Sequence, residues 1–147
     1  MKNIKPISLE DCLPLRQKVL WPSLTVEECI DPEDQYSKHV GYILDNQVVS
    51  CFSIYPKLQN NYQIRKFATS PSFQRKGIGT KLFTTVLNDL KQKKIEFVTL
   101  NARITAVEFY KKFDFYLSGK KIIKKNILFI PMQIALKDFN FKYNSIE

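Results

Sequence analysis

The sequence of 147 residues has few of the residue types that metal sites and disulfide scaffolds need. It contains one histidine, His39, and three cysteines without a CxxC pair, Cys12, Cys29 and Cys51. Structural zinc is usually held by four Cys or His ligands at close spacing, so we expect no metal site of this kind. The three scattered cysteines are instead expected to be small buried apolar residues.

Long apolar runs are also missing, since no stretch approaches the ~20 residues that cross a membrane. The first twenty residues contain acids and prolines where a signal peptide has its apolar run, so we expect a cytoplasmic protein with no membrane partner. Hydrophobic residues make up 44% and charged residues 25%, which is ordinary for a globular protein. The length fits a single domain, residues 1–147, since domains typically hold roughly 100–150 residues.

Positive charge is concentrated in the second part of the chain. Residues 61–147 contain 17 Lys or Arg against 6 Asp or Glu, whereas residues 1–60 contain 6 against 8. Such a basic half indicates nucleic acid, an anionic membrane or a phosphate-rich small molecule as partner, or only a solvated surface. Only four of the 23 cations are Arg, and no nucleic-acid-binding motif is present. A nucleic-acid-binding module is therefore the weakest of these alternatives.

Apolar periodicity predicts a mixed sheet with helices packed on it. Helices are expected from an N-cap at Ser8 to Leu20, in the acidic segment 27–34, after Gly77 to Leu90, and over 105–113. The expected strands are Lys2–Pro6, His39–Leu44, Val48–Tyr55, Tyr62–Thr69, Ile95–Asn101, Phe115–Leu117 and Ile127–Leu136.

Three local signals refine this assignment. Asp45–Gln47 has the composition of a hairpin turn, and Thr105 with Glu108 forms a capping-box pattern before the last helix. Pro131 places its strand at an edge or a bulge, because proline cannot donate to a sheet ladder. The apolar segment Ile127–Met132 would suit pairing across a homodimer.

The strand around residue 65 has an irregular pattern. Tyr62 and Ile64 are apolar at one parity of the alternation, whereas Phe67 is apolar at the other. One extra residue near Arg65-Lys66, a β-bulge, would reconcile them and leave backbone groups available to a ligand. A different assignment of the buried side chains would explain the pattern equally well.

Two of the four glycines, Gly77 and Gly79, lie in the segment Gln74–Thr80 between that strand and an amphipathic helix. A glycine-bearing turn that enters a helix lets the backbone approach a pyrophosphate, which the first-turn N–H groups then bind. Arg75 and Lys76 add positive charge. The segment is neither a P-loop nor a dinucleotide fingerprint, whose third glycine would fall at Leu82. A tight turn with no ligand remains the alternative.

A family resemblance rests on two motifs. The segment Phe67–Leu82 resembles the acyl-CoA motif of the GNAT superfamily of N-acetyltransferases, with Gln74, Gly77 and Gly79 at its defining positions. Leu100–Arg103 followed by Phe109–Phe115 resembles the second signature of that family. The resemblance implies an α/β (α+β) fold with a mostly antiparallel central sheet of about seven strands, flanked by about four helices.

The resemblance also implies a reaction and the residues that serve it. The activity would be acetyl transfer from acetyl-CoA to a primary amine of a small molecule or peptide, by direct attack in a ternary complex and without a metal. Tyr110 would be the general acid that protonates the leaving thiolate. The residues expected at the cofactor are Phe67, Ala68, Thr69, Gln74, Arg75, Lys76, Gly77, Ile78, Gly79, Thr80 and Asn101. Without the family, Tyr110 reads as a core aromatic and Asn101 as the end of a strand.

The sequence departs from the family in ways that leave the general base unassigned. Gln63 stands where many relatives have a glutamate on the bulged strand, and Asp114 stands at a usual glycine. A catalytically silent acyl-CoA-binding domain is therefore an alternative. The acidic run from Glu27 to Asp34 lies in the region that lines the acceptor site in this fold. It is either a negative rim that attracts a cationic amine or a solvated loop.

Overall fold

The computed structural model describes residues 3–140 and has one mixed sheet of eight strands. The order across the sheet is β1-β2-β3-β4-β5-β8-β6, with β7 also paired to β8. Only β4 and β5 run parallel, so the expectation of a mostly antiparallel sheet is confirmed. The strands are β1 Ile4–Ile7, β2 Lys38–Leu44, β3 Gln47–Lys57, β4 Asn61–Thr69, β5 Phe97–Arg103, β6 Tyr116–Leu117, β7 Ile122–Lys124 and β8 Ile127–Ala135.

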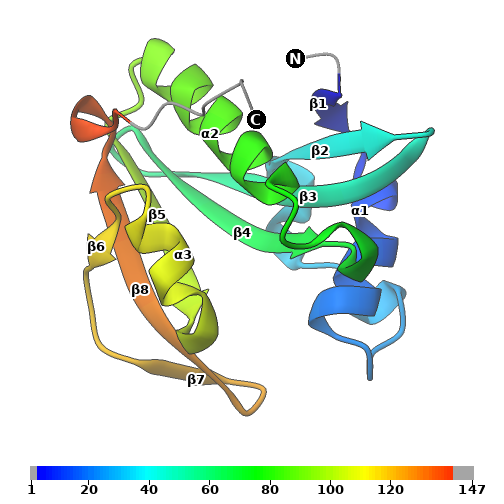
Figure 1. Cartoon of the computed structure of the whole chain (residues 1–147). Coiled ribbons are helices and arrows are strands. Elements are labelled where there is room, and N and C mark those ends of the chain that lie inside the picture. The colour runs from blue at the N-terminus through cyan, green and yellow to red at the C-terminus, as the bar shows by residue number, and fades with distance from the viewer. Residues whose placement is uncertain (1–2, 141–147) are drawn as a thin grey trace.

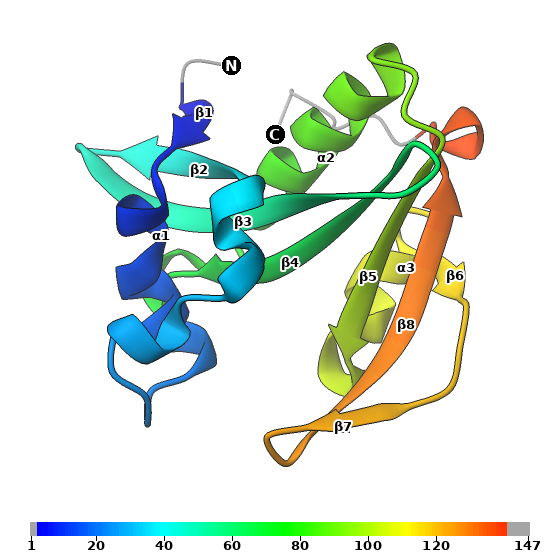
Figure 2. The ribbon, with the colours of Figure 1, turned by 180° about the vertical axis from the view of Figure 1, so that it is seen from behind.

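Helices cover both faces of the sheet (Figures 1 and 2). Helix α1, Leu9–Leu15, lies on one face, whereas α2, Ile78–Gln92, and α3, Val107–Lys111, lie on the other. The acidic segment forms two short 3₁₀ helices, Glu27–Cys29 and Pro32–Tyr36, rather than an α-helix. The described residues therefore contain three α-helices where about four were expected.

Helix α1 begins where the sequence predicts. The Ser8 side chain accepts from the backbone N–H of Asp11, and the Asp11 side chain accepts from the backbone N–H of Ser8, which makes a reciprocal capping box. After Pro14 the helix continues as a π-helical turn, Arg16–Leu20, and Trp21 ends it. Of the first predicted strand, Lys2 lies outside the described residues.

The apolar stripe of α2 packs onto the sheet and forms the main core. Leu82, Phe83 and Leu87 are fully buried, and Val98 and Leu100 of β5 meet them from the sheet. Burying side chains of this size stabilises the fold by roughly 1.5–3 kcal/mol each. This packing fixes the first turn of α2 against β4. The three cysteines are free and buried, as expected.

The predicted bulge in β4 is confirmed. Ser53 of β3 pairs with Arg65, whereas Cys51, two residues away, pairs with Ala68, three residues away. The extra residue lies in the stretch where Lys66 has a positive φ of 64°. Such an irregularity increases the local twist of the strand. Here it occurs in the part of β4 that follows the residues paired with β5.

Two expectations about the region after β5 are wrong. The predicted capping box at Thr105 does not form, because residues 104–106 make a 3₁₀ turn and α3 starts after Ala106 without a side-chain cap. The segment Ile127–Met132 is not free to pair with a second copy. Strand β8 is bordered by β5 on one edge and by β6 and β7 on the other.

Pro131 fits β8 because of the gap between β6 and β7. The Pro131 carbonyl accepts from the backbone N–H of Ser118, so this carbonyl points to the edge of β8 opposite β5. The N–H and C=O of a strand residue point to the same edge, and the missing donor therefore faces the gap. Asp114 has a φ of 69° after α3, the left-handed conformation expected at the usual glycine position.

Among residues 3–140, no helix is both long and apolar enough to cross a membrane. Within the same residues, His, Cys, Asp and Glu do not gather into a group of three that could hold a metal ion.

Candidate active site

Strands β4 and β5 pair only at their first residues. The parallel ladder joins Asn61–Gln63 to Phe97–Thr99, and beyond it the two strands diverge (Figures 1 and 2). A cavity of about 350 Å³ lies between the diverging ends. Because the facing edges have no strand partner there, their backbone groups are available to a bound molecule. The lining comes from β4, β5, α3, the segment after α1, and the hairpin of β7 and β8.

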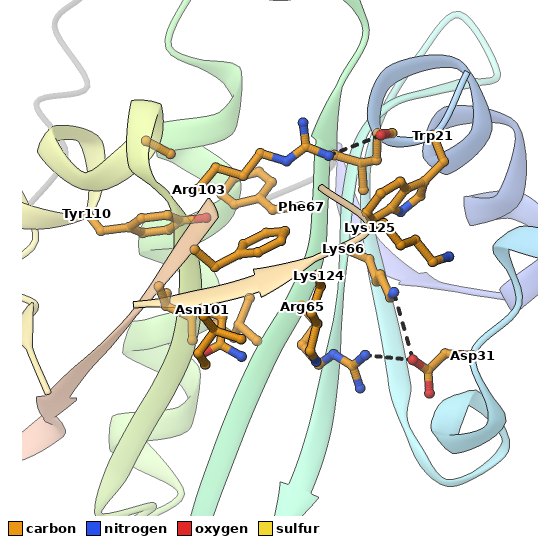
Figure 3. A pocket seen from close by; sticks show the side chains of 16 residues that line it. Trp21, Asp31, Arg65, Lys66, Phe67, Asn101, Arg103, Tyr110, Lys124 and Lys125 are labelled. Carbon is orange, nitrogen blue, oxygen red and sulfur yellow. Dashed lines mark hydrogen bonds and ion pairs between the residues drawn. The ribbon is translucent and has the colours of Figure 1, made fainter. Parts of the chain in front are cut away.

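Tyr110 of α3 lines this cavity, and its hydroxyl points into it (Figure 3). The ring is held edge-on by Phe83 at 5.5 Å and by Phe109 at 5.2 Å between ring centroids. The residue is only 9% exposed. Burial raises the pKa of Tyr110 well above its ordinary range, because the charged phenolate is poorly solvated there. The side chain is therefore a positioned hydroxyl that ionises only at a higher pH than an exposed tyrosine.

Phe67 and Asn101 also line the cavity, one on each of the diverging strands. Phe67 stacks on Phe83 at 5.7 Å, so the same aromatic cluster positions Phe67 and Tyr110. Asn101 lies beyond the last residues that pair β5 with β4. The structure thus brings Phe67 and Asn101, two residues predicted to bind the cofactor, to the same cavity as Tyr110, the predicted general acid.

The turn Gln74–Thr80 between β4 and α2, called the Gly77 turn below, lies next to Phe67. Gly77 caps α2 with φ 79°, a left-handed conformation that favours glycine. A Cβ on Gly79 would lie 3.5 Å from the Phe67 ring and 3.4 Å from the hydroxyl of Thr69, so the first turn of α2 lies directly against β4. First-turn N–H groups of a helix have no intrahelical acceptor and carry partial positive charge.

The remaining predicted cofactor residues border the turn rather than the cavity. Gln74 donates from its side chain to the Thr69 carbonyl at 2.9 Å, which closes the loop between β4 and α2. Arg75 has a φ of 63° and is exposed, as is Lys76. Ala68 is buried in the ladder with β3. The predicted set therefore divides into a cavity group and a turn group joined where Gly79 meets Phe67.

Five cationic side chains line the cavity, and sequence reasoning did not place them there. They are Arg65, Lys66, Arg103, Lys124 and Lys125, and Asp31 is the one carboxylate among the lining residues (Figure 3). The bulge directs attention to Arg65 and Lys66, but nothing in the sequence shows that β7 folds back to bring Lys124 and Lys125 to β5.

Asp31 is neutralised by the cations of β4. It accepts from Arg65 at 2.6 Å and lies 3.8 Å from the Lys66 amine. Partial burial opposes ionisation of Asp31, but hydrogen bonds from the Glu33 backbone and from Arg65 lower its pKa overall. Burial together with the Arg65 charge lowers the pKa of Lys66. A carboxylate held in this way is a weak base.

Two of the cations that line the cavity, Arg103 and Lys125, lie over the ring of Trp21. The Arg103 guanidinium lies 5.4 Å from the centroid of the indole and the Lys125 amine 4.8 Å from it. These are cation–π contacts, and Arg103 also donates to the Leu20 carbonyl at 3.0 Å. Arg103 is half-buried, and this partial removal from water lowers its pKa.

The hypothesis of a negative rim is wrong for this cavity. Of the acidic run from Glu27 to Asp34, only Asp31 is among the lining residues, and two cations neutralise it. Glu33 pairs with Lys57 at 2.7 Å, and Asp34 is buried against Arg16. Asp31, Glu33 and Asp34 hold their segment against the sheet through these ion pairs, and the cavity itself is positive.

Gln63 is the last residue of β4 that pairs with β5, through Thr99. It therefore stands where the strands part, and it is not among the residues that line the cavity. The described cavity has no carboxylate in addition to Asp31, so it supplies no free carboxylate base.

Comparisons with known proteins agree with this geometry. Residues 18–136 match the family model of the acetyltransferase (GNAT) domain. The uncharacterized N-acetyltransferase YitI of Bacillus subtilis (strain 168) is 28% identical over 120 residues, which cover 76% of this chain and 80% of that protein. The chain therefore belongs to the GNAT family of acetyltransferases.

Solved structures show the same fold. A GNAT family acetyltransferase from Elizabethkingia anophelis with acetyl-CoA bound superposes with a TM-score of 0.71 at 20% identity, covering 92% of this chain and 99% of that one. The ribosomal-protein-S18-alanine N-acetyltransferase from Escherichia coli gives a TM-score of 0.76 at 13% identity, covering 94% and 98%. The predicted mixed, mostly antiparallel α/β architecture is thus confirmed.

Proposed function

We propose that residues 1–147 form one acyl-CoA N-acyltransferase domain that transfers an acetyl group from acetyl-CoA to a primary amine of a small molecule or peptide. The observation that carries this proposal is the Tyr110 hydroxyl in the cavity between the diverging β4 and β5, next to the Gly77 turn. The cytoplasmic location expected from the sequence is likewise a proposal.

Acetyl-CoA would bind in two parts. The turn Gln74–Thr80 and the first N–H groups of α2 would hold the pyrophosphate, because they offer donors and partial positive charge without a Cβ at Gly77 or Gly79. The open edge of β4 at Phe67–Thr69 would hydrogen-bond the pantetheine arm and the thioester carbonyl. Asn101 would contact the cofactor from β5.

The transfer would be a direct displacement. The amine nitrogen donates its lone pair to the thioester carbonyl carbon, so an N–C bond forms and the C–S bond breaks with its electron pair going to sulfur. Tyr110 gives its hydroxyl proton to that sulfur. The newly acylated nitrogen releases one of its protons to water, and solvent restores the proton of Tyr110. Because burial raises the pKa of Tyr110, its hydroxyl retains the proton to a higher pH than an exposed tyrosine does.

The proton of the incoming ammonium must leave before attack, because the amine pKa is about 10.4. Asp31 is held by Arg65 and Lys66, and Gln63 has no basic group. We propose that water in the open cavity accepts this proton. The positive charge of the cavity assists, since nearby cations lower the pKa of an ammonium group.

One observation favours a second function. With Gln63 at the usual carboxylate position and Asp31 neutralised, the cavity lacks a strong base. A catalytically silent acyl-CoA-binding domain would need the Gly77 turn but no base.

The two functions are separated by mixing the protein with acetyl-CoA and a panel of primary amines, and by analysing the products by mass spectrometry. Appearance of one acetylated amine, absent without protein, supports the transferase. Binding of acetyl-CoA in calorimetry, with no acetylated product from any amine, would favour the silent domain. Absence of acetyl-CoA binding would contradict both.

A further inference from the structure

The cavity has more positive charge than its own carboxylate neutralises. Asp31 is occupied by Arg65 and Lys66 of the bulged strand. Among residues 3–140, no ion pair joins Arg103, Lys124 or Lys125 to a carboxylate. These three line the same cavity from β5 and from the hairpin of β7 and β8.

The fold holds these cations near each other. Arg103 and Lys125 lie 5.4 Å and 4.8 Å from the centroid of the same Trp21 ring. They are therefore separated by no more than about one Debye length, roughly 10 Å at 0.1 M salt, and repel each other. Hydrogen bonds from Thr25, among them one of 2.8 Å from its backbone N–H, lower the pKa of Glu28, and the charge of Lys125 contributes least to this shift. Glu28 does not line the cavity.

We propose that Arg103, Lys124 and Lys125 bind an oxyanion, a carboxylate or a phosphate, that the acceptor carries in addition to its amine. The acceptors would then be acidic amines, such as free amino acids or aminoalkyl phosphates. This inference rests on the proposed function, because it names the acceptor class for the same cavity.

The arrangement suits this ligand chemically. An oxyanion close to these cations offsets their mutual repulsion, and guanidinium–oxyanion hydrogen bonds are among the stronger ones in proteins. Partial removal of Arg103 from water strengthens its attraction to an anion. Trp21 provides a flat apolar surface beside the charges. A purely cationic acceptor, in contrast, would meet five positive side chains and one neutralised acid.

The test compares matched ligands on the full chain bound to CoA. Calorimetry measures the affinity of the common amino acids against their methyl esters, and of aminoethyl phosphate against ethanolamine. At least one acid is expected to bind about tenfold or more tightly than its counterpart without the oxyanion. The matching pair shows whether carboxylate or phosphate is the preferred anion.

Two double variants locate the effect. K124Q/K125Q should reduce the tenfold preference for the acid to about twofold or less and leave the affinity for acetyl-CoA unchanged. K120Q/K121Q removes the same charge from exposed neighbours that do not line the cavity, and should keep the preference.

Three results would overturn the inference while acetyl-CoA still binds. These are equal or tighter binding of the counterparts without the oxyanion, no binding of any acid, and loss of acetyl-CoA affinity in K124Q/K125Q, which would mean that the lysines hold the cofactor. Failure of the wild-type protein to bind acetyl-CoA would instead contradict the proposed function.

Discussion

Arg16 and Asp34 form a bidentate ion pair against strand β3, with N–O distances of 2.7 and 2.8 Å. Both residues are buried. Arg16 comes from the π-helical turn after α1, and Asp34 comes from the second 3₁₀ helix. Tyr55 of β3 donates its hydroxyl to the same carboxylate at 2.6 Å. The pair thereby fastens the segment that contains Trp21 and Asp31, two residues that line the cavity, to the sheet.

Removing the charge of Asp34 should destabilise the fold strongly. Asp34→Asn leaves a buried guanidinium without its counter-charge, and breaking a buried pair in this way costs about 3–5 kcal/mol. Urea unfolding measures the loss. Glu33→Gln is the matched control, because the Glu33–Lys57 pair is half exposed and contributes about 0–1 kcal/mol. Equal effects of the two substitutions would contradict the structural role of Asp34.

The same pair predicts a response to acid. Burial alone would raise the pKa of Asp34, but hydrogen bonds from Arg16 and Tyr55 outweigh it and lower the pKa from 3.8 to about 2. A lowered pKa stabilises the fold above 3.8, and this contribution of ~2 kcal/mol disappears as the pH falls through about 2. The stability difference between wild type and Asp34→Asn should therefore shrink in this range. A constant difference would show that Asp34 titrates normally.

Gly77→Ala should damage both stability and cofactor binding. The residue has φ 79°, and a side chain in this left-handed conformation costs roughly 1–2 kcal/mol. Thermal unfolding should show this loss, and calorimetry should show weaker acetyl-CoA binding, because the cap of α2 shifts. Unchanged stability would mean that the turn relaxes without cost.

Gly79→Ala separates the two effects. Gly79 has no positive φ, and its added Cβ would make ordinary contacts with Thr69 and Phe67, so stability should stay within ~1 kcal/mol of wild type. If the backbone of this turn approaches the pyrophosphate, the methyl group should weaken acetyl-CoA binding about tenfold. Undiminished affinity would place the pyrophosphate elsewhere.

The dependence of activity on alkaline pH tests the role of Tyr110. The ordinary pKa of tyrosine is 10.0, and burial raises that of Tyr110 above it. The hydroxyl therefore keeps its proton above pH 10, so the kcat/KM profile should rise with deprotonation of the amine and show no descending limb at that pH. A descending limb that disappears in Tyr110→Phe would show an unshifted phenol.

Periodicity and local chemistry predicted most of the elements from the sequence. The Ser8 cap, the stripe of α2 and the bulge near Lys66 depend on neighbouring residues, and each is found. The predicted capping box at Thr105 does not form because residues 104–106 adopt a 3₁₀ turn, which the pattern of Thr and Glu does not reveal.

The charge of the cavity was not predictable, because it depends on contacts between distant residues. Lys125 contacts Trp21, which lies far earlier in the sequence, and Asp31 pairs with Arg65 of strand β4. Net charge suggested a phosphate-bearing partner but not where the cations gather. The acidic run suggested a negative rim, since a sequence does not show which carboxylates are neutralised by pairing.

The most direct test of the account is acceptor-dependent release of free CoA thiol by the wild type and by Tyr110→Phe. The account predicts that the wild type releases thiol only with an amine present, and that kcat in the variant falls about 10²-fold or more. The affinity for acetyl-CoA and the melting curve should remain unchanged. Tyr42→Phe, a buried tyrosine outside the cavity, is the control and should retain full activity. Equal kcat values for wild type and Tyr110→Phe would contradict the assignment of Tyr110, and release without any amine would contradict transfer to an acceptor.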